Sequence, residues 1–256
     1  MTDTPAASQP KQARLFILVG ITAFLLFVVA LMPLSVLIAG LDDRFGATAV
    51  GSPSDATISG RFLGPDYGRQ VIKLKSGPFD LIDLAFDGAF TLSGQGMAGA
   101  GKLHKGIWGA IGLQDTQLSF SAGLLSLPFS LAGAVDVTIN RAELTPEGQC
   151  ISLDGTVTTD AFEKSRETLV GWMGPRLTGT LGCDEGQITL LASGSRGSDQ
   201  ITIQGAIPGI GPRIGAGVGN TLEIRILSDN PALRAGLKQV GFKEIDERTL
   251  VSRLGE

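Results

Sequence analysis

The stretch VDVTIN, residues 135–140, alternates apolar and polar side chains and decides the fold class. Val135, Val137 and Ile139 would face one side of a strand, while the residues between them would face the other side. The same period of two recurs along the chain at Ile151, Leu153 and Val157; Ile188 and Leu190; Ile201, Ile203 and Ile207; and Leu222, Ile224 and Ile226. These segments predict a mainly β protein with a one-sided, antiparallel sheet of many strands.

Weaker alternation predicts further strands at 57–63, 70–75, 89–92 and 117–122. Glycine-containing turn signals separate the segments, among them Pro146-Glu147-Gly148, Asp184-Glu185-Gly186 and Ser195-Arg196-Gly197. Glycine makes up 36 of the 256 residues, about twice its usual share, without the period of three that collagen requires. This abundance favours short strands joined by tight turns.

Two helices are predicted to interrupt the sheet. Asp160 is placed to cap a helix that runs to Met173, with Glu163 three residues after the cap. The pair Asn230-Pro231 predicts the start of a second helix, which stops at Gly241. Their apolar stripes are too narrow to cover so many strands. We therefore expect the sheet to curl on itself or to face another apolar surface.

Residues 15–39 contain no charged side chain and would form a helix about 37 Å long, against a hydrocarbon core of about 30 Å. They predict a single transmembrane helix. A cleaved secretory signal is the alternative, but such signals have shorter apolar regions and end at a site of small residues. Lys11 and Arg14 precede the segment and Arg44 follows it. This excess of basic residues before the segment predicts a cytoplasmic N-terminus.

This topology divides the chain into a cytoplasmic tail (1–14), a transmembrane anchor (15–39), a linker rich in small residues (40–56) and a periplasmic β-rich domain (57–256). With 43% hydrophobic residues the chain can bury a sizeable core. Its net charge of −4 gives no broad attraction for phosphate backbones, which argues against nucleic acid as a partner.

Cys150 and Cys183 are the only cysteines. In an oxidising compartment they would form a structural disulfide bond that stabilises the fold by about 4 kcal/mol on the chain-entropy estimate. Two free thiols in the core, or a metal site, are the alternatives. Two cysteines and one histidine cannot complete a zinc site at the usual spacing, and the C-x-x-C pattern of redox pairs is absent.

The segment GMAGAGKL, residues 96–103, approaches a phosphate-binding loop. Leu103 stands where that motif needs a serine or threonine to hold magnesium, so we expect a flexible glycine-rich connection instead. The glycine-rich run 209–219 is likewise expected to be a loop. His104, the single histidine, is expected to lie solvated in a loop rather than to act as a base.

The remaining candidates for chemistry are weaker still. Asp80, Asp83 and Asp87 are spaced at three and four residues, which is typical of a solvated helix face rather than of an acid–base pair. Trp108 and Trp172 are expected to pack in the core or near the membrane. We therefore expect no enzyme activity, no metal and no cofactor.

Three segments carry a recognisable order of motifs: LLSLPFSLAGAVDVTINRAEL at 124–144, GQCISLDGTVTT at 148–159 and LTGTLGCDEGQITLLASGS at 177–195. This order closely resembles the N protein of the bacterial type II secretion system. The single N-terminal anchor and the closing leucine-rich helix at 233–242 add to the resemblance. It is good over about 118–207 and weaker over 45–117, where ATISGRFLG lacks the tryptophan that the family often has.

The resemblance implies a bacterial inner-membrane, periplasm-facing scaffold or accessory component of the machine that moves folded proteins across the outer membrane. It implies a disulfide bond between Cys150 and Cys183, partners among the other inner-membrane components, and no cofactor. The family also looks distantly related to envelope proteins whose curved sheets accommodate lipid. The alternative is therefore an envelope lipid-binding or lipid-transfer protein with a curved apolar β face. An envelope hydrolase is a third hypothesis, for which we find no nucleophile and base.

Overall fold

The computed structural model describes residues 48–52, 55–60, 68–76, 85–106, 110–124, 131–145, 148–165, 171–208 and 221–254. They form one antiparallel sheet of fourteen strands, in which neighbours in the chain are neighbours in the sheet except that β14 lies between β12 and β13. The predicted tail (1–14) and anchor (15–39) lie outside the described residues. Within the described part, no helix is long and apolar enough to span a bilayer.

The strands are β1 (Thr48–Ser52), β2 (Asp55–Gly60), β3 (Gln70–Ser76), β4 (Ala85–Gly94), β5 (Met97–Gly106), β6 (Ile111–Ser121), β7 (Ala134–Leu144), β8 (Cys150–Thr159), β9 (Leu177–Asp184), β10 (Gln187–Arg196), β11 (Asp199–Pro208), β12 (Thr221–Leu227), β13 (Lys243–Glu244) and β14 (Thr249–Leu254). The helices are a 3-10 turn, η2 (Ala122–Leu124), and the α-helices α4 (Ala161–Lys164) and α5 (Pro231–Gln239). The mainly β, antiparallel fold class predicted from the sequence is confirmed.

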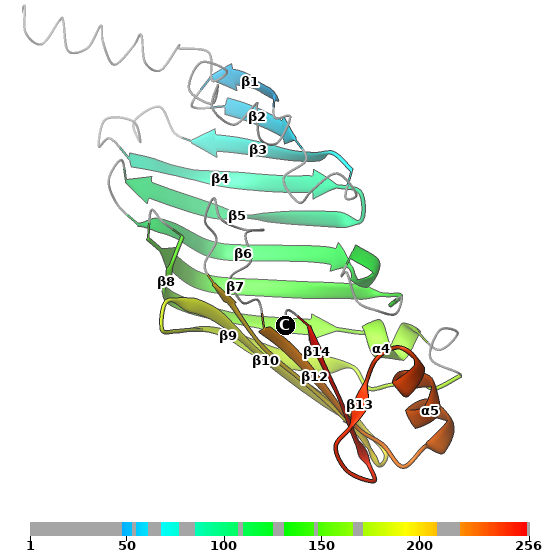
Figure 1. Cartoon of the computed structure of the whole chain (residues 1–256). Helices are drawn as coiled ribbons and strands as arrows, with labels where there is room; N and C mark the ends of the chain where they lie inside the picture. The colour runs from blue at the N-terminus through cyan, green and yellow to red at the C-terminus, as the bar shows by residue number, and fades with distance from the viewer. Residues whose placement is uncertain are drawn as a thin grey trace, which may run out of the picture.

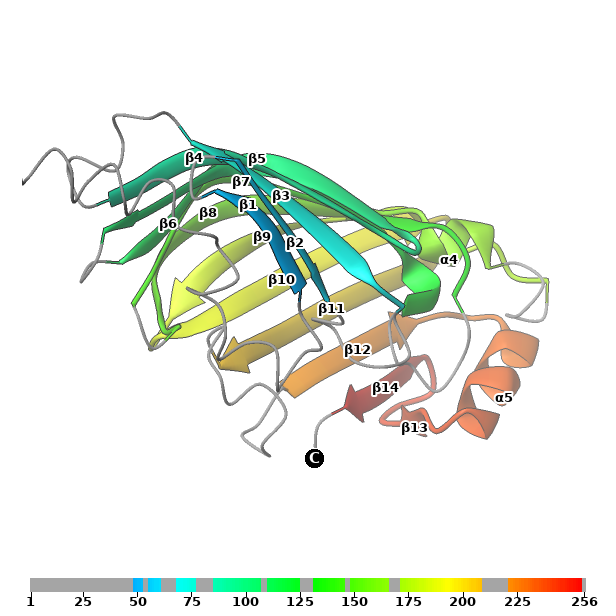
Figure 2. The same ribbon diagram turned by 90° about the horizontal axis from the view of Figure 1, so that it is seen from above.

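The sheet curls into an open trough, and α4 and α5 lie at the same end of it (Figure 1, Figure 2). Residues paired across antiparallel strands point to the same face, so the register assigns each side chain to the concave or the convex side. Ile72 pairs with Ile58 and with Leu92, and these three share the concave face. The curvature of the sheet in Figure 1 and Figure 2 confirms the expectation that it curls.

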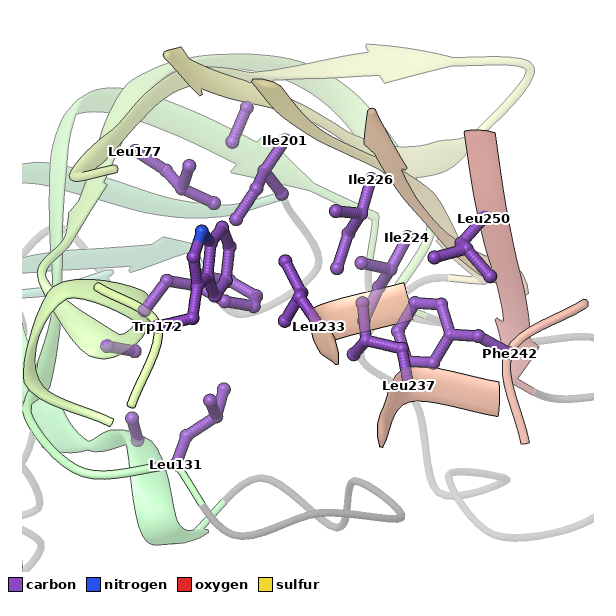
Figure 3. Close-up of a cluster of buried hydrophobic side chains, with 14 of the residues drawn as sticks. Leu131, Trp172, Leu177, Ile201, Ile224, Ile226, Leu233, Leu237, Phe242 and Leu250 are labelled. Carbon is purple, nitrogen blue, oxygen red and sulfur yellow. The ribbon is translucent and has the colours of Figure 1, made fainter. Parts of the chain in front are cut away.

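The hydrophobic core fills the end of the trough beside α5 (Figure 3). Sheet residues on the concave face pack there against the helix and the segments around it. The buried cluster includes Leu177, Ile201, Ile224, Ile226 and Leu250 from the strands, Phe162 from α4, Leu233 and Leu237 from α5, and Trp172 and Phe242 from the connections. The alternation seen in the sequence at 201–207 and 222–226 thus marks the core side of β11 and β12.

Glycines on the concave face let neighbouring strands approach closely where the sheet curls. A Cβ at Gly179 in β9 would lie 2.3 Å from the carbonyl oxygen of Leu191, and one at Gly101 in β5 would lie 2.1 Å from Oγ1 of Thr116. Real Cβ atoms do not come this close to another heavy atom. Part of the glycine excess therefore serves strand packing, in addition to the turns predicted from the sequence.

The second predicted helix is confirmed, with the expected start. Asn230 is the N-cap of α5, and its side-chain oxygen accepts hydrogen bonds from the backbone N–H of Ala232 and Leu233 at 3.0 and 3.2 Å. Pro231 is the first helical residue. The helix ends at Gln239, just before Gly241, whose φ of +97° is a left-handed conformation that favours glycine.

The first predicted helix is much shorter than expected. α4 ends at Lys164, and Met173, where the helix was predicted to end, is not helical. The side chain of Asp160 makes no capping hydrogen bond. Instead, it accepts a hydrogen bond from the backbone N–H of Ala134 at the start of β7. A capping pattern in the sequence does not reveal such a competing tertiary partner.

Several strands were not predicted. β1 and the start of β2 lie within 40–56, the range interpreted as a linker, because small side chains do not prevent backbone pairing. The segment interpreted as a flexible connection forms most of β5. The strand directly before it, β4, contains the predicted strand at 89–92 but is longer at both ends. At the C-terminus, β14 follows α5 and pairs with β12.

Candidate functional site

The candidate functional site is the concave face of β2 to β6, which we call the open trough. Its large apolar residues come from alternate positions on each strand: Ile58, Ile72, Leu74, Phe90, Leu92, Met97, Leu103, Leu113, Leu118 and Phe120. All of them are half-buried, in contrast to the fully buried side chains around α5. Among these ten, only Phe120 packs against the main core cluster.

Few polar groups lie on the open trough. Across residues 56–60, 70–76, 88–103 and 111–120, the concave positions carry no charged side chain. The side chains of Gln70 and Thr116 are buried, at 1% and 0% exposure, and donate hydrogen bonds to the nearby backbone oxygens of Gly68 and Gln114. The face therefore suits a hydrocarbon surface better than a polar or charged ligand.

Most charged residues of this half of the sheet lie on the convex face, whereas Lys105 of β5, paired with Phe86 and Ile111, occupies a concave position in the register. His104, expected in a loop, lies in β5 opposite Asp87 of β4. Its Nδ1 is 3.7 Å from a carboxylate oxygen of Asp87, and both side chains are more than half exposed. Lys102 donates to Asp115 at 2.7 Å, and this hydrogen bond raises the pKa of Lys102. These are solvated surface pairs.

Several of the residues considered for catalysis or nucleotide binding fall where the structure gives no description. Asp80, Asp83, Trp108 and the run 209–219 lie outside the described residues. In the segment 97–103, the backbone is paired with β4 and β6 rather than left free to cradle a phosphate. Among the described residues, no three His, Cys, Asp or Glu side chains are grouped so as to hold a metal ion.

A disulfide bond joins Cys150 of β8 to Cys183 of β9, with their Cα atoms 5.6 Å apart. The register between β7 and β8 shifts beside it, between Glu143 and Leu144, which leaves Ile151 without a direct partner. Ile151 is consequently 53% exposed, so its predicted place on the same face as Leu153 is wrong. The shift brings Cys150 to the concave face, where it is buried.

A polar bridge, missed in the sequence, fixes the filled end of the trough. The carboxylate of Asp199 accepts one hydrogen bond from Nε1 of Trp172 and one from Oγ of Ser228, each at 2.6 Å. Ser228 Oγ in turn accepts from the backbone N–H of Asn230, the cap of α5. This chain of bonds ties β11, the segment of Trp172 and the start of α5 together. Trp172 is buried, as expected.

Ion pairs hold α5 and the last strands in place. Glu244 of β13 pairs with Lys238 and with Arg234 of α5, the latter at 2.8 Å. The hydrogen bond from Lys238, and then that from Arg234, lowers the pKa of Glu244. On the convex face Glu223 lies between Arg253 at 2.9 Å and Arg225 at 3.0 Å, and Arg253 is the main cause of the lowered pKa of Glu223.

No curated protein and no solved structure matches the chain. A family model described as type II secretion system (T2SS), protein N matches residues 73–249. The match extends from β3 to the first residue of β14 and thus includes the disulfide bond, the polar bridge, α5 and most of the open trough. Since it covers more than half of the sequence, the chain belongs to the family of type II secretion system protein N.

Proposed function

We propose that this type II secretion system component is a scaffold of the inner membrane. In this proposal residues 15–39 anchor the chain, 1–14 are cytoplasmic, and the sheet stands in the periplasm and supports export of folded proteins across the outer membrane. The match to the protein N family carries the proposal. The apolar segment 15–39 and the disulfide bond, which suits an oxidising compartment, support it.

The proposed role is binding and scaffolding rather than catalysis. The one carboxylate–histidine pair, Asp87 and His104, lies exposed on the convex face, and the residue opposite His104 on β6 is Gly112, which has no side chain to act as a nucleophile. Other inner-membrane components of the secretion machine are the proposed partners, and no cofactor is part of the proposal.

Deletion of the gene in its host tests the secretion role. Release of folded exoproteins, or the abundance of the inner-membrane partners, should fall and should be restored by the full chain. A chain in which a cleavable export signal replaces residues 1–39 should restore less, since it reaches the periplasm without an anchor. The scaffold role is wrong if deletion changes neither quantity and no secretion component co-purifies with the chain.

The open trough favours a second function, the binding or transfer of envelope lipid. Its half-buried apolar side chains, and the absence of charge from its concave positions in 56–60, 70–76, 88–103 and 111–120, match the needs of acyl chains, which require no hydrogen-bonding partner. Burying this face against hydrocarbon would gain about 25 cal/mol per Å² of apolar surface removed from water.

Leu92 and Thr91 offer a matched pair for testing lipid binding, because they are adjacent in β4 and point to opposite faces. Native mass spectrometry of the full chain in mild detergent should show bound lipid. Leu92→Glu should reduce the bound fraction several-fold, whereas Thr91→Glu should leave it unchanged. Absence of lipid from the wild-type chain, or equal losses in the two variants, would rule out this function.

A further inference from the structure

The two edges of the sheet differ in how they are protected. At the C-terminal edge β13 pairs with β14, placing Lys243 opposite Val251 and Glu244 opposite Leu250. Glu244 is held there by the ion pairs to α5. A short, charged covering strand of this kind is a common device against pairing with another chain. This edge is therefore poorly suited to receive a further strand.

Among the described residues, no covering strand of this kind protects the N-terminal edge. β1 has the sequence TAVGS, without charge or proline, and within the described part of the chain it pairs with β2 alone. Val50, at the centre of β1, points to the convex face with Thr57 and is 72% exposed. It is the most exposed large hydrophobic side chain in the described part of the chain. Apart from the guanidinium of Arg69, which donates to Oγ1 of Thr48 at 2.7 Å, this edge carries no charge, and such an edge is a template for strand addition.

We propose that β1 pairs antiparallel with β1 of a second copy of this chain, about a twofold axis through Val50. This register places Val50 opposite Val50, Thr48 opposite Ser52, and Ala49 opposite Gly51. Each pair is chemically matched, and no charge faces a like charge. A twofold axis requires such self-complementarity, because the same surface of each copy contacts that of the other.

The face of each residue also fits this pairing. Ala49 and Gly51 occupy concave positions beside Ile58 and Ala56, whereas Thr48, Val50 and Ser52 occupy convex positions. Pairing would therefore join the concave faces of the two copies without a polar break. It would also cover each exposed Val50 with its counterpart. The result is one continuous sheet with fourteen strands from each copy.

A second copy fits better than a head-to-tail contact, in which β1 of one chain would meet β14 of the next. Such a contact would require β13 to leave β14 and would break the ion pairs between Glu244 and α5. The inference does not depend on the role in secretion or on lipid, because it rests on the two edges alone. The contact involves only a short strand, so we expect it to be weak.

Cysteine crosslinking of the full chain in its native membrane tests the pairing. Val50→Cys introduces the only free thiol, because both natural cysteines are bonded to each other. Cα atoms directly opposite in an antiparallel pair lie about 4.5–5.5 Å apart, within the range of a disulfide bond. Mild oxidation should give a covalent homodimer on a non-reducing gel.

Leu191→Cys is the matched control, because Leu191 is also an exposed apolar residue, at 55%, but lies in the middle of the sheet. We expect several-fold more homodimer from Val50→Cys. As a second measurement, in concentrated samples in mild detergent the fraction of dimer should be higher for wild type and for Leu191→Lys than for Val50→Lys, where two ammonium groups would oppose each other.

The proposal fails if Val50→Cys gives no more homodimer than Leu191→Cys, or if it crosslinks to a different protein instead of itself. It also fails if Val50→Lys is as dimeric as Leu191→Lys. Both positions are exposed, so the variants are expected to fold. An intact bond between Cys150 and Cys183 in each variant checks that they do.

Discussion

Asp160 shows how a single residue can connect distant segments. Its Oδ1 accepts from the backbone N–H of Ala134 at 2.8 Å, and its Oδ2 is 2.7 Å from Nζ of Lys164. The hydrogen bond from Lys164 is the main cause of the lowered pKa of Asp160, with burial acting in the opposite direction. The carboxylate thus ties α4 to β7 instead of capping its own helix.

The lowered pKa of Asp160 makes part of the stability depend on pH. Its folded pKa lies below the unfolded value of about 4, so the stabilisation is complete above that value and is lost as pH falls through the folded pKa. Asp160→Asn should lower the free energy of unfolding at pH 7 by about 0.5–1.5 kcal/mol. In urea titrations this difference should shrink at acidic pH. Asp136→Asn, at an exposed position of β7, is the control and should show neither effect.

Asp199 is the central acceptor of the polar bridge. Asp199→Ala would leave Nε1 of Trp172 and Oγ of Ser228 without this acceptor, at a cost of about 1–3 kcal/mol in unfolding free energy. In a Trp108→Phe background, fluorescence reports on Trp172 alone. We expect its emission to shift to longer wavelength as the indole becomes wetter. Unchanged emission and stability would show that the bridge does not hold this end of the trough.

At the scale of elements, β5 explains why glycine-rich strands escape recognition. Its concave positions are Met97, Gly99, Gly101, Leu103 and Lys105, so glycines occupy two of the places where a hydrophobic period would be seen. The segment then resembles a loop in the sequence. Its strand conformation comes from pairing with β4 and β6 on both sides, which local sequence patterns do not encode.

Because strands approach closely at some concave glycines, we expect a Gly→Ala substitution to lower the unfolding free energy more on the concave face than on the convex face. Gly179→Ala should lower unfolding free energy by more than about 2 kcal/mol, because its Cβ would lie 2.3 Å from the backbone oxygen of Leu191. Gly112→Ala, in β6, is the matched control, since its Cβ would lie 3.6 Å from the nearest atom. Its effect should stay within about 0.5 kcal/mol. Urea unfolding of both variants measures the contrast, which equal effects would contradict.

At the scale of the whole molecule, the trough has a packed half and an open half. Every member of the main buried cluster lies between Ala122 and Leu250. The strands β2 to β5 contribute none, and strand pairing with half-buried contacts holds them. One continuous sheet therefore contains regions with very different amounts of buried apolar surface.

This asymmetry predicts unequal local stability. In hydrogen exchange of the native chain, amides of β9 to β12 should open only with global unfolding, whereas those of β2 to β4 should exchange at a lower free energy. Peptide-resolved mass spectrometry measures both regions in one sample. Equal protection would mean that the open half is held by contacts beyond those described here, such as an occupant of the trough.

The sequence by itself determined the β class, the strands around VDVTIN, the α5 start at Asn230-Pro231 and the family, because these depend on local periodicity, capping chemistry and motif order. Only the tertiary structure decided between a curled sheet and one covered by another apolar surface, and only it revealed the strand formed by MAGAGKL, the role of Asp160 and the separation of packed and open halves. Those features depend on which segments lie side by side. Contacts between residues far apart in the chain fix them, and no local pattern records such contacts.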